Sequence, residues 1–151
     1  MNLKSIPNIV KDWFIEYDKW TQSWENDKNY IKTLQEYNSD PLSSSKIAIR
    51  IVKPNSKVLS AGCGAGREVK FLVRELNCKV TALDISKNMI EMSKKIEPKA
   101  KYIQGDMASF LSEEKFDHIV CLWNTINFIP NLTLRKKFIH TCYNNLRGGE
   151  I

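Results

Sequence analysis

Short apolar runs alternate with helix-like stretches from residue 57 onwards. The runs "KVLSAG", "KVTALD", "KYIQG" and "FDHIVCLW" have the length and apolar character of buried strands. Between and after them, apolar residues recur at offsets of three and four, as on the buried face of a helix: Val69, Leu72, Val73 and Leu76, then Met89, Ile90 and Ile96 in a helix starting at Ser86, and last Leu134, Phe138, Cys142 and Leu146. This alternation predicts the α/β class, with a doubly wound parallel sheet and helices on both faces.

The first 55 residues show helical patterns and no strand pattern. Helices are expected over residues 8–24, over 28–37 and from Asp40 to Pro54. The first of these carries an apolar stripe along one face, made of Val10, Trp13, Phe14, Tyr17, Trp20 and Trp24. We therefore expect an N-terminal helical extension over residues 1–55, serving as a lead-in or lid, and one α/β domain over residues 56–151.

The end of the sequence predicts the beginning of a fifth strand. Gly148 and Gly149 favour the exit of a helix, and Glu150 and Ile151 would be the first residues of the strand. A sheet that stopped at the fourth strand would leave "HIVCLW" as an apolar, unpaired edge, which natural proteins avoid. We therefore expect a fragment whose C-terminal strands are missing, or a partner that supplies them.

Composition narrows the functional classes. With 42% hydrophobic and 26% charged residues, the chain is typical of a globular domain, and no apolar run approaches the length of a membrane helix. No secretory leader pattern begins the sequence, so a cytoplasmic protein is expected. The four cysteines lack the spacing of a zinc site or disulfide framework. The net charge of +6 is spread along the chain, which favours solvated surfaces over a nucleic-acid site.

Glycines follow the first predicted strand in "VLSAGCGAGRE", at Gly62, Gly64 and Gly66. Ligands of open α/β sheets bind beyond the carboxyl ends of the strands, where bare backbone allows a flat ligand to approach closely. A tight strand-to-helix turn is the alternative reason for such glycines. Asp84 ends the next strand, at the offset expected for a carboxylate that accepts from ribose hydroxyls. As an alternative, Asp84 would cap the following helix, although Ser86 suits that role better.

The glycine spacing departs from the nicotinamide fingerprint G-x-G-x-x-G/A, because the third glycine comes one position early and Arg67 follows it. Together, "VLSAGCGAGRE", "VTALDIS", "YIQGDM" and "FDHIVCLWNTINFIP" resemble the successive motifs of class I S-adenosylmethionine-dependent methyltransferases. The resemblance covers residues 56–151 and implies a Rossmann-like fold that binds S-adenosyl-L-methionine as cofactor. A nicotinamide-dependent oxidoreductase is the competing interpretation of the glycine loop.

The resemblance also implies which residues contact the cofactor. The segment from Ala61 to Gly66 would wrap its methionine and ribose, Asp84 would hold the ribose, and Asp106 would accept from the adenine amino group. The full implied set is Ser60, Ala61, Gly62, Cys63, Gly64, Gly66, Asp84, Ile85, Met89, Asp106, Met107, Leu122 and Trp123. Ser60 is a departure, because many family members carry an acidic residue there, associated with the amino-acid end of the cofactor. For Asp106 the alternative is a carboxylate that faces water in a turn.

The stretch "LWNTINFIPN" bears on the methyl acceptor. It lacks the motifs of enzymes that methylate adenine, glutamine amides or cytosine carbon, and it resembles small-molecule N-methyltransferases. Asn124 would position the substrate, or it would cap the following turn. A small-molecule acceptor is thus expected, with an RNA-directed methyltransferase or an inactive cofactor-binding fragment as alternatives. No metal site, no membrane partner and no particular oligomeric state is indicated.

Overall fold

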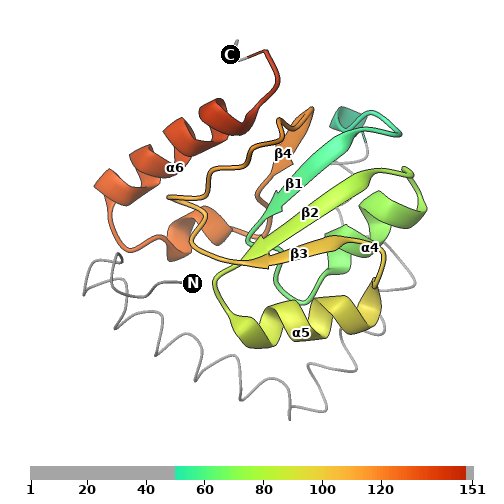
Figure 1. The fold of residues 1–151 in the computed structure, drawn as a ribbon. Coiled ribbons are helices and arrows are strands. Elements are labelled where there is room, and N and C mark those ends of the chain that lie inside the picture. The colour runs from blue at the N-terminus through green and yellow to red at the C-terminus, as the bar shows by residue number, and fades with distance from the viewer. Residues whose placement is uncertain (1–49, 149–151) are drawn as a thin grey trace.

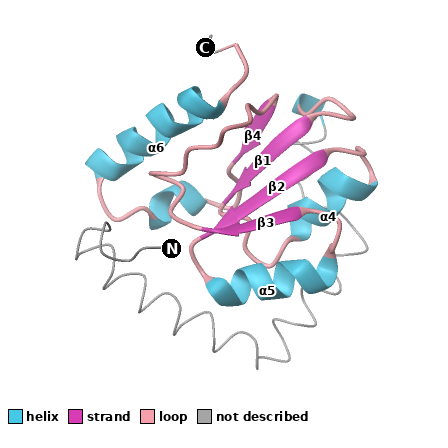
Figure 2. Ribbon diagram, viewed as in Figure 1, coloured by secondary structure: helices cyan, strands magenta, loops and turns pink. Residues whose placement is uncertain are grey.

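The computed structural model of the chain describes residues 50–148, in which strands and helices alternate as expected up to the third strand, and the fourth strand then follows without an intervening helix (Figures 1 and 2). The elements in chain order are β1 (Lys57–Ala61), α4 (Arg67–Arg74), β2 (Lys79–Asp84), α5 (Lys87–Ile96), β3 (Lys101–Gln104), β4 (His118–Val120), the 3-10 helix η2 (Thr125–Phe128) and α6 (Leu132–Asn145).

The sheet is parallel throughout and has the strand order β3-β2-β1-β4. Val58 of β1 pairs with Val80 of β2 on one side and with His118 of β4 on the other. The chain moves outward from β1 through β2 to β3, and β4 then returns to the opposite side of β1. This reversal places a topological switch point at the carboxyl ends of β1 and β4, where ligands of such sheets bind.

Helices cover both faces of the sheet, as predicted (Figure 1). On the face of α4 and α5, Val69, Leu72 and Ile90 pack with Val58 and Val80. On the opposite face, Phe138 of α6 packs with Ala61, Ala108 and Ile129. The periodic apolar positions of the sequence are therefore the residues that attach each helix to the sheet. The doubly wound, Rossmann-like architecture is confirmed.

The fourth strand is shorter than its sequence suggests. The apolar run 116–123 predicts one long strand, whereas β4 covers only His118–Val120 and its residues are half-buried. Within the described residues β4 pairs only with β1, so fewer hydrogen bonds hold it extended. The chain then turns away, because Trp123 and Asn124 adopt left-handed φ angles of 59° and 62° that lead into η2.

Several expectations lie outside the described residues. They are the helices before residue 50 and the start of the fifth strand at residues 150–151, so the N-terminal lid, the domain boundary and the truncation stay predictions. Arg50 and Ile51 are helical. Within residues 50–148, no helix is both long and apolar enough to cross a bilayer. All four cysteines are free thiols.

Candidate functional site

The glycine loop joins β1 to α4 and lies against the end of β2. The amide groups of Gly62 and Cys63 both donate to the carbonyl oxygen of Leu83, at 2.8 and 3.0 Å. Gly66 donates to the carbonyl of Cys63 at 3.1 Å, which closes the turn before α4 begins. The loop is thus fixed to the neighbouring strand by its own backbone.

The glycines of this loop have different tasks. A Cβ atom at Gly66 would lie 2.1 Å from Ser93 Oγ, and one at Gly62 would lie 2.2 Å from Thr125 Cγ2. These two glycines therefore allow the loop to pack against α5 and η2. A Cβ at Gly64 would meet no atom within 4 Å, although φ there is +52°. Gly64 faces open space, so it is the position where bare backbone is available to a ligand.

Asp84, at the carboxyl end of β2, is buried and connects the glycine loop to the start of α5. Its Oδ2 accepts from the amide of Gly64 at 2.8 Å, and its Oδ1 accepts from the amide of Ser86 at 2.9 Å. Burial raises the pKa of this carboxyl above its ordinary value, while the amide donors partly oppose the rise. Ser86 caps α5 by accepting from the amide of Met89, so Asp84 is free of that task.

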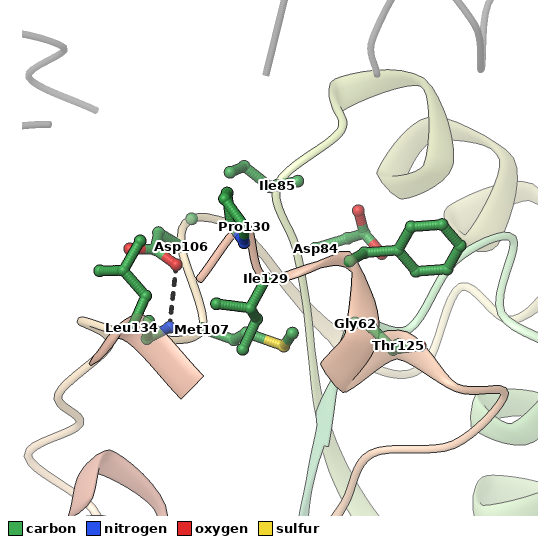
Figure 3. A pocket seen from close by; sticks show the side chains of 12 residues that line it. Gly62, Asp84, Ile85, Asp106, Met107, Thr125, Ile129, Pro130 and Leu134 are labelled. Atoms are coloured by element: carbon green, nitrogen blue, oxygen red, sulfur yellow. Dashed lines mark hydrogen bonds between the residues drawn. The ribbon is translucent and has the colours of Figure 1, made fainter. Parts of the chain in front are cut away.

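Two cavities meet at Asp84, at the switch point of the sheet. The larger, of about 270 Å³, is lined by residues from β1, the glycine loop, α4, α5 and the segment after β4. Of the residues expected to bind a cofactor it brings together Ser60, Gly62, Cys63, Gly64, Asp84, Met89, Leu122 and Trp123. The smaller, of about 50 Å³, brings in Ile85, Asp106 and Met107 (Figure 3). Both cavities share Gly62, Asp84, Thr125 and Phe128.

Asp106 lies on the wall of the smaller cavity and also holds its own turn. Its Oδ1 accepts from the amide of Ala108 at 2.9 Å, the bond drawn in Figure 3, and its Oδ2 accepts from Ser109 Oγ at 3.0 Å. The side chain is half-buried, so its exposure agrees both with a ligand contact and with a carboxylate that faces water. Each carboxylate oxygen can accept a second bond, so a contact with adenine stays a prediction.

Three of the expected residues are absent from the lining of these two cavities. Ala61 and Gly66 are buried behind it, where they pack against Phe138 and Ser93 respectively. Asn124 is exposed, and its Oδ1 and backbone oxygen accept from the side chain and amide of Asn127. This arrangement agrees with its alternative role in the turn, and substrate positioning by Asn124 stays a prediction.

The structure adds residues that sequence reasoning did not assign to the site. Thr125 and Phe128 of η2 line both cavities, and Arg67 and Glu68 line the larger one. The indole Nε1 of Trp123 donates to Glu68 Oε1, and the Arg67 guanidinium lies 4.1 Å from the centroid of the same indole. The available signals were the position of "NTINF" directly after an apolar strand and that of Arg67 and Glu68 directly after the glycine loop.

Known proteins share this domain. The family model described as "Methyltransferase domain" matches residues 58–149, more than half of the chain. The chain is similar to the 23S rRNA (cytidine-2'-O)-methyltransferase TlyA of Campylobacter jejuni, with 33% identity over 85 residues. That match covers 52% of this chain and only 34% of the length of the curated relative.

Solved structures share the fold. A TehB-like SAM-dependent methyltransferase from Corynebacterium glutamicum superposes with a TM-score of 0.71 at 24% identity, covering 83% of this chain and 68% of the other. The SAM-bound amino pentose methyltransferase CalS10 from Micromonospora echinaspora gives a TM-score of 0.65 at 20% identity, covering 78% of this chain and 52% of the other. At these identities the likeness establishes the architecture of the domain.

Proposed function

The chain belongs to the methyltransferase domain family, and from this premise we propose that it binds S-adenosylmethionine and transfers the methyl group to a small-molecule acceptor. The observation that carries the proposal is the open backbone at Gly64 beside the buried carboxylate of Asp84. A nucleoside fits this pair, because its ribose needs an acceptor for its hydroxyls and close contact with the backbone.

The arrangement of the cavities supports one orientation of the ligand. Ile85 and Met107 give the smaller cavity the apolar walls that suit an adenine ring, and Asp106 supplies an acceptor there. Asp84 lines both cavities, which supports a ribose bound between them. The larger cavity then receives the amino-acid end and the sulfur. The same carboxylate would repel the 2′-phosphate of a phosphorylated dinucleotide.

The demands on the protein are modest, because S-adenosylmethionine supplies a methyl group already activated on a positively charged sulfur. The residues of the site have to align the acceptor with the methyl carbon and exclude water, and such alignment can lower a barrier by roughly 7–11 kcal/mol. No acid–base pair is required for this. Phe128 and Trp123 border the larger cavity from the η2 side and would shield the reacting atoms.

A small acceptor is supported by the segment after β4. Its sequence lacks the motifs used on bases and amides, and Phe128 and Pro130 add apolar surface to the lining of the smaller cavity. The fold is shared with an amino pentose methyltransferase, which shows that this architecture accommodates such a substrate in that protein. RNA is the second candidate, favoured by the net charge of +6 and by the rRNA methyltransferase among the relatives.

Titration calorimetry of the full chain tests the cofactor, with S-adenosylhomocysteine and NAD as the two ligands. We expect binding of S-adenosylhomocysteine at one site per chain and none of NAD. The reverse preference would refute the proposal. Transfer of a labelled methyl group to a low-mass metabolite fraction, against a total RNA fraction, then separates the acceptors. Labelling of RNA that falls steeply with added salt would favour the second candidate.

A further inference from the structure

The larger cavity contains a charged pair that contacts one indole ring. Among the described residues that line this cavity, the charged side chains are Arg67, Glu68 and Asp84. Asp84 accepts from backbone amides with both oxygens and lies at the junction with the smaller cavity. Arg67 and Glu68 are therefore the charges that remain for the far end of a ligand.

Both side chains are largely withdrawn from solvent. The Glu68 side chain is 10% exposed and the Arg67 side chain 20%, and Arg67 Nε lies 4.0 Å from Glu68 Oε1, at the outer limit of an ion pair. Burial of a carboxylate is unfavourable unless hydrogen bonds and an opposite charge compensate it. Placement in the first turn of α4 helps Glu68, because the helix dipole favours negative charge there.

Trp123 lines the same cavity and contacts both members of the pair. Its indole Nε1 donates to Glu68, while its ring lies under the Arg67 guanidinium at 4.1 Å, a cation–π distance. Trp123 is 44% exposed, so part of its surface faces solvent. A carboxylate and a guanidinium are thus presented side by side on the wall of the larger cavity, which shares Asp84 with the smaller cavity proposed for the adenine.

We infer that Glu68 and Arg67 bind the zwitterionic amino-acid end of the methyl donor, an inference that rests on the proposed function. Glu68 accepts hydrogen bonds from the α-ammonium group, and Arg67 donates to the α-carboxylate. Ser60 lines the same cavity without a charge, so Glu68 provides the negative charge at this end. The pair then acts as a specificity element that distinguishes the complete donor from nucleosides without an amino-acid group.

The test compares two ligands on the full chain by titration calorimetry. S-adenosylhomocysteine has the amino-acid end, whereas 5′-methylthioadenosine keeps the adenosine and sulfur and lacks it. We expect Glu68→Gln and Arg67→Gln each to weaken S-adenosylhomocysteine binding about tenfold or more, because a charge-assisted contact is lost. Binding of 5′-methylthioadenosine should change by less than about twofold, since that ligand has no group at this position.

Controls separate the possible failures. Glu75→Gln removes the same charge from the exposed end of α4 and should leave both affinities unchanged. Equal weakening of both ligands by Glu68→Gln and Arg67→Gln, or no weakening of either, would overturn the inference while leaving the proposed function intact. Binding of neither ligand by the unmodified chain would refute the proposed function, and this inference with it. If Glu68→Gln fails to fold, Arg67→Gln alone decides the matter.

Discussion

A methyl group added at Gly66 should destabilise the fold strongly, whereas one added at Gly64 should destabilise it only slightly and should mainly weaken ligand binding. At Gly66 the new Cβ would lie 2.1 Å from Ser93 Oγ and 2.9 Å from Ser93 Cα, and φ is +88°. A left-handed conformation costs a non-glycine residue roughly 1–2 kcal/mol, and overpacking a core adds about 1–3 kcal/mol. The lost freedom of the unfolded chain offsets about 0.4–1 kcal/mol of this, so the free energy of unfolding should fall by about 1–5 kcal/mol in Gly66→Ala.

Gly64→Ala is the matched comparison. The conformational penalty of about 1–2 kcal/mol is partly offset by the loss of freedom in the unfolded chain, worth about 0.4–1 kcal/mol. Because no atom lies within 4 Å of the added Cβ, no packing penalty follows. The methyl group instead occupies the space assigned to the ligand, so S-adenosylhomocysteine affinity should fall at least about tenfold, or about 1.4 kcal/mol.

Urea unfolding followed by tryptophan fluorescence measures the first effect, and calorimetric titration of S-adenosylhomocysteine measures the second. Ser93→Gly in the Gly66→Ala background should restore stability only in part, because the Ser93 backbone atom at 2.9 Å remains. Equal stability of the two alanine variants would refute the packing argument. Unchanged binding by a folded Gly64→Ala protein would refute the assignment of Gly64 to the ligand.

Further predictions concern charge, thiols and a buried amide. Burial raises the Asp84 pKa above its ordinary value of 3.8, and ribose hydroxyls donate to the ionised form. The affinity for S-adenosylhomocysteine should therefore fall as pH drops through that raised pKa, and titrations at a series of pH values should show a clearly weaker pH dependence for Asp84→Asn; an equal dependence in both proteins would contradict the assignment. Burial also raises the pKa of Cys121 and Cys142 to about 11. Ellman's reagent at pH 7.5 should therefore modify these two thiols far more slowly in the native protein than in the urea-unfolded protein, and equally fast reaction would contradict their burial. Asn145→Leu should lower the free energy of unfolding by about 2–4 kcal/mol in a denaturant titration. The buried side-chain amide of Asn145 donates to the carbonyl oxygen of Phe110 and accepts from the backbone amide of Ser112, and both groups would lose this partner; an unchanged midpoint would refute the prediction.

The sequence predicted the order of the elements because their periodicity is local. Val69 and Leu72 mark the buried face of α4, and Ser86 is the N-cap of α5, as their patterns indicated. These features depend on neighbours within a few positions along the chain. For the same reason the glycine loop and the strand-end carboxylate of Asp84 were found from spacing alone.

The rest of the site depends on how distant segments meet. Glu68 and Trp123 are 55 positions apart, and they meet because β4 returns beside β1 and brings the following turn over the glycine loop. Sequence patterns contain no signal for such a meeting. The left-handed backbone at Trp123 and Asn124 could not be predicted from the sequence either, because glycine, the usual marker of that conformation, is absent there. The early end of β4 follows from this turn.

The most direct test of the account is a crystal structure of the full chain with S-adenosylhomocysteine. We predict that the ribose hydroxyl oxygens lie within about 3 Å of the Asp84 carboxylate. We also predict that the ligand contacts the backbone of Gly64 and that its adenine lies beside Ile85 and Met107. Density for the ligand at any other surface, or a ribose turned away from Asp84, would contradict the central claim that this loop and this carboxylate hold one adenosine-bearing methyl donor.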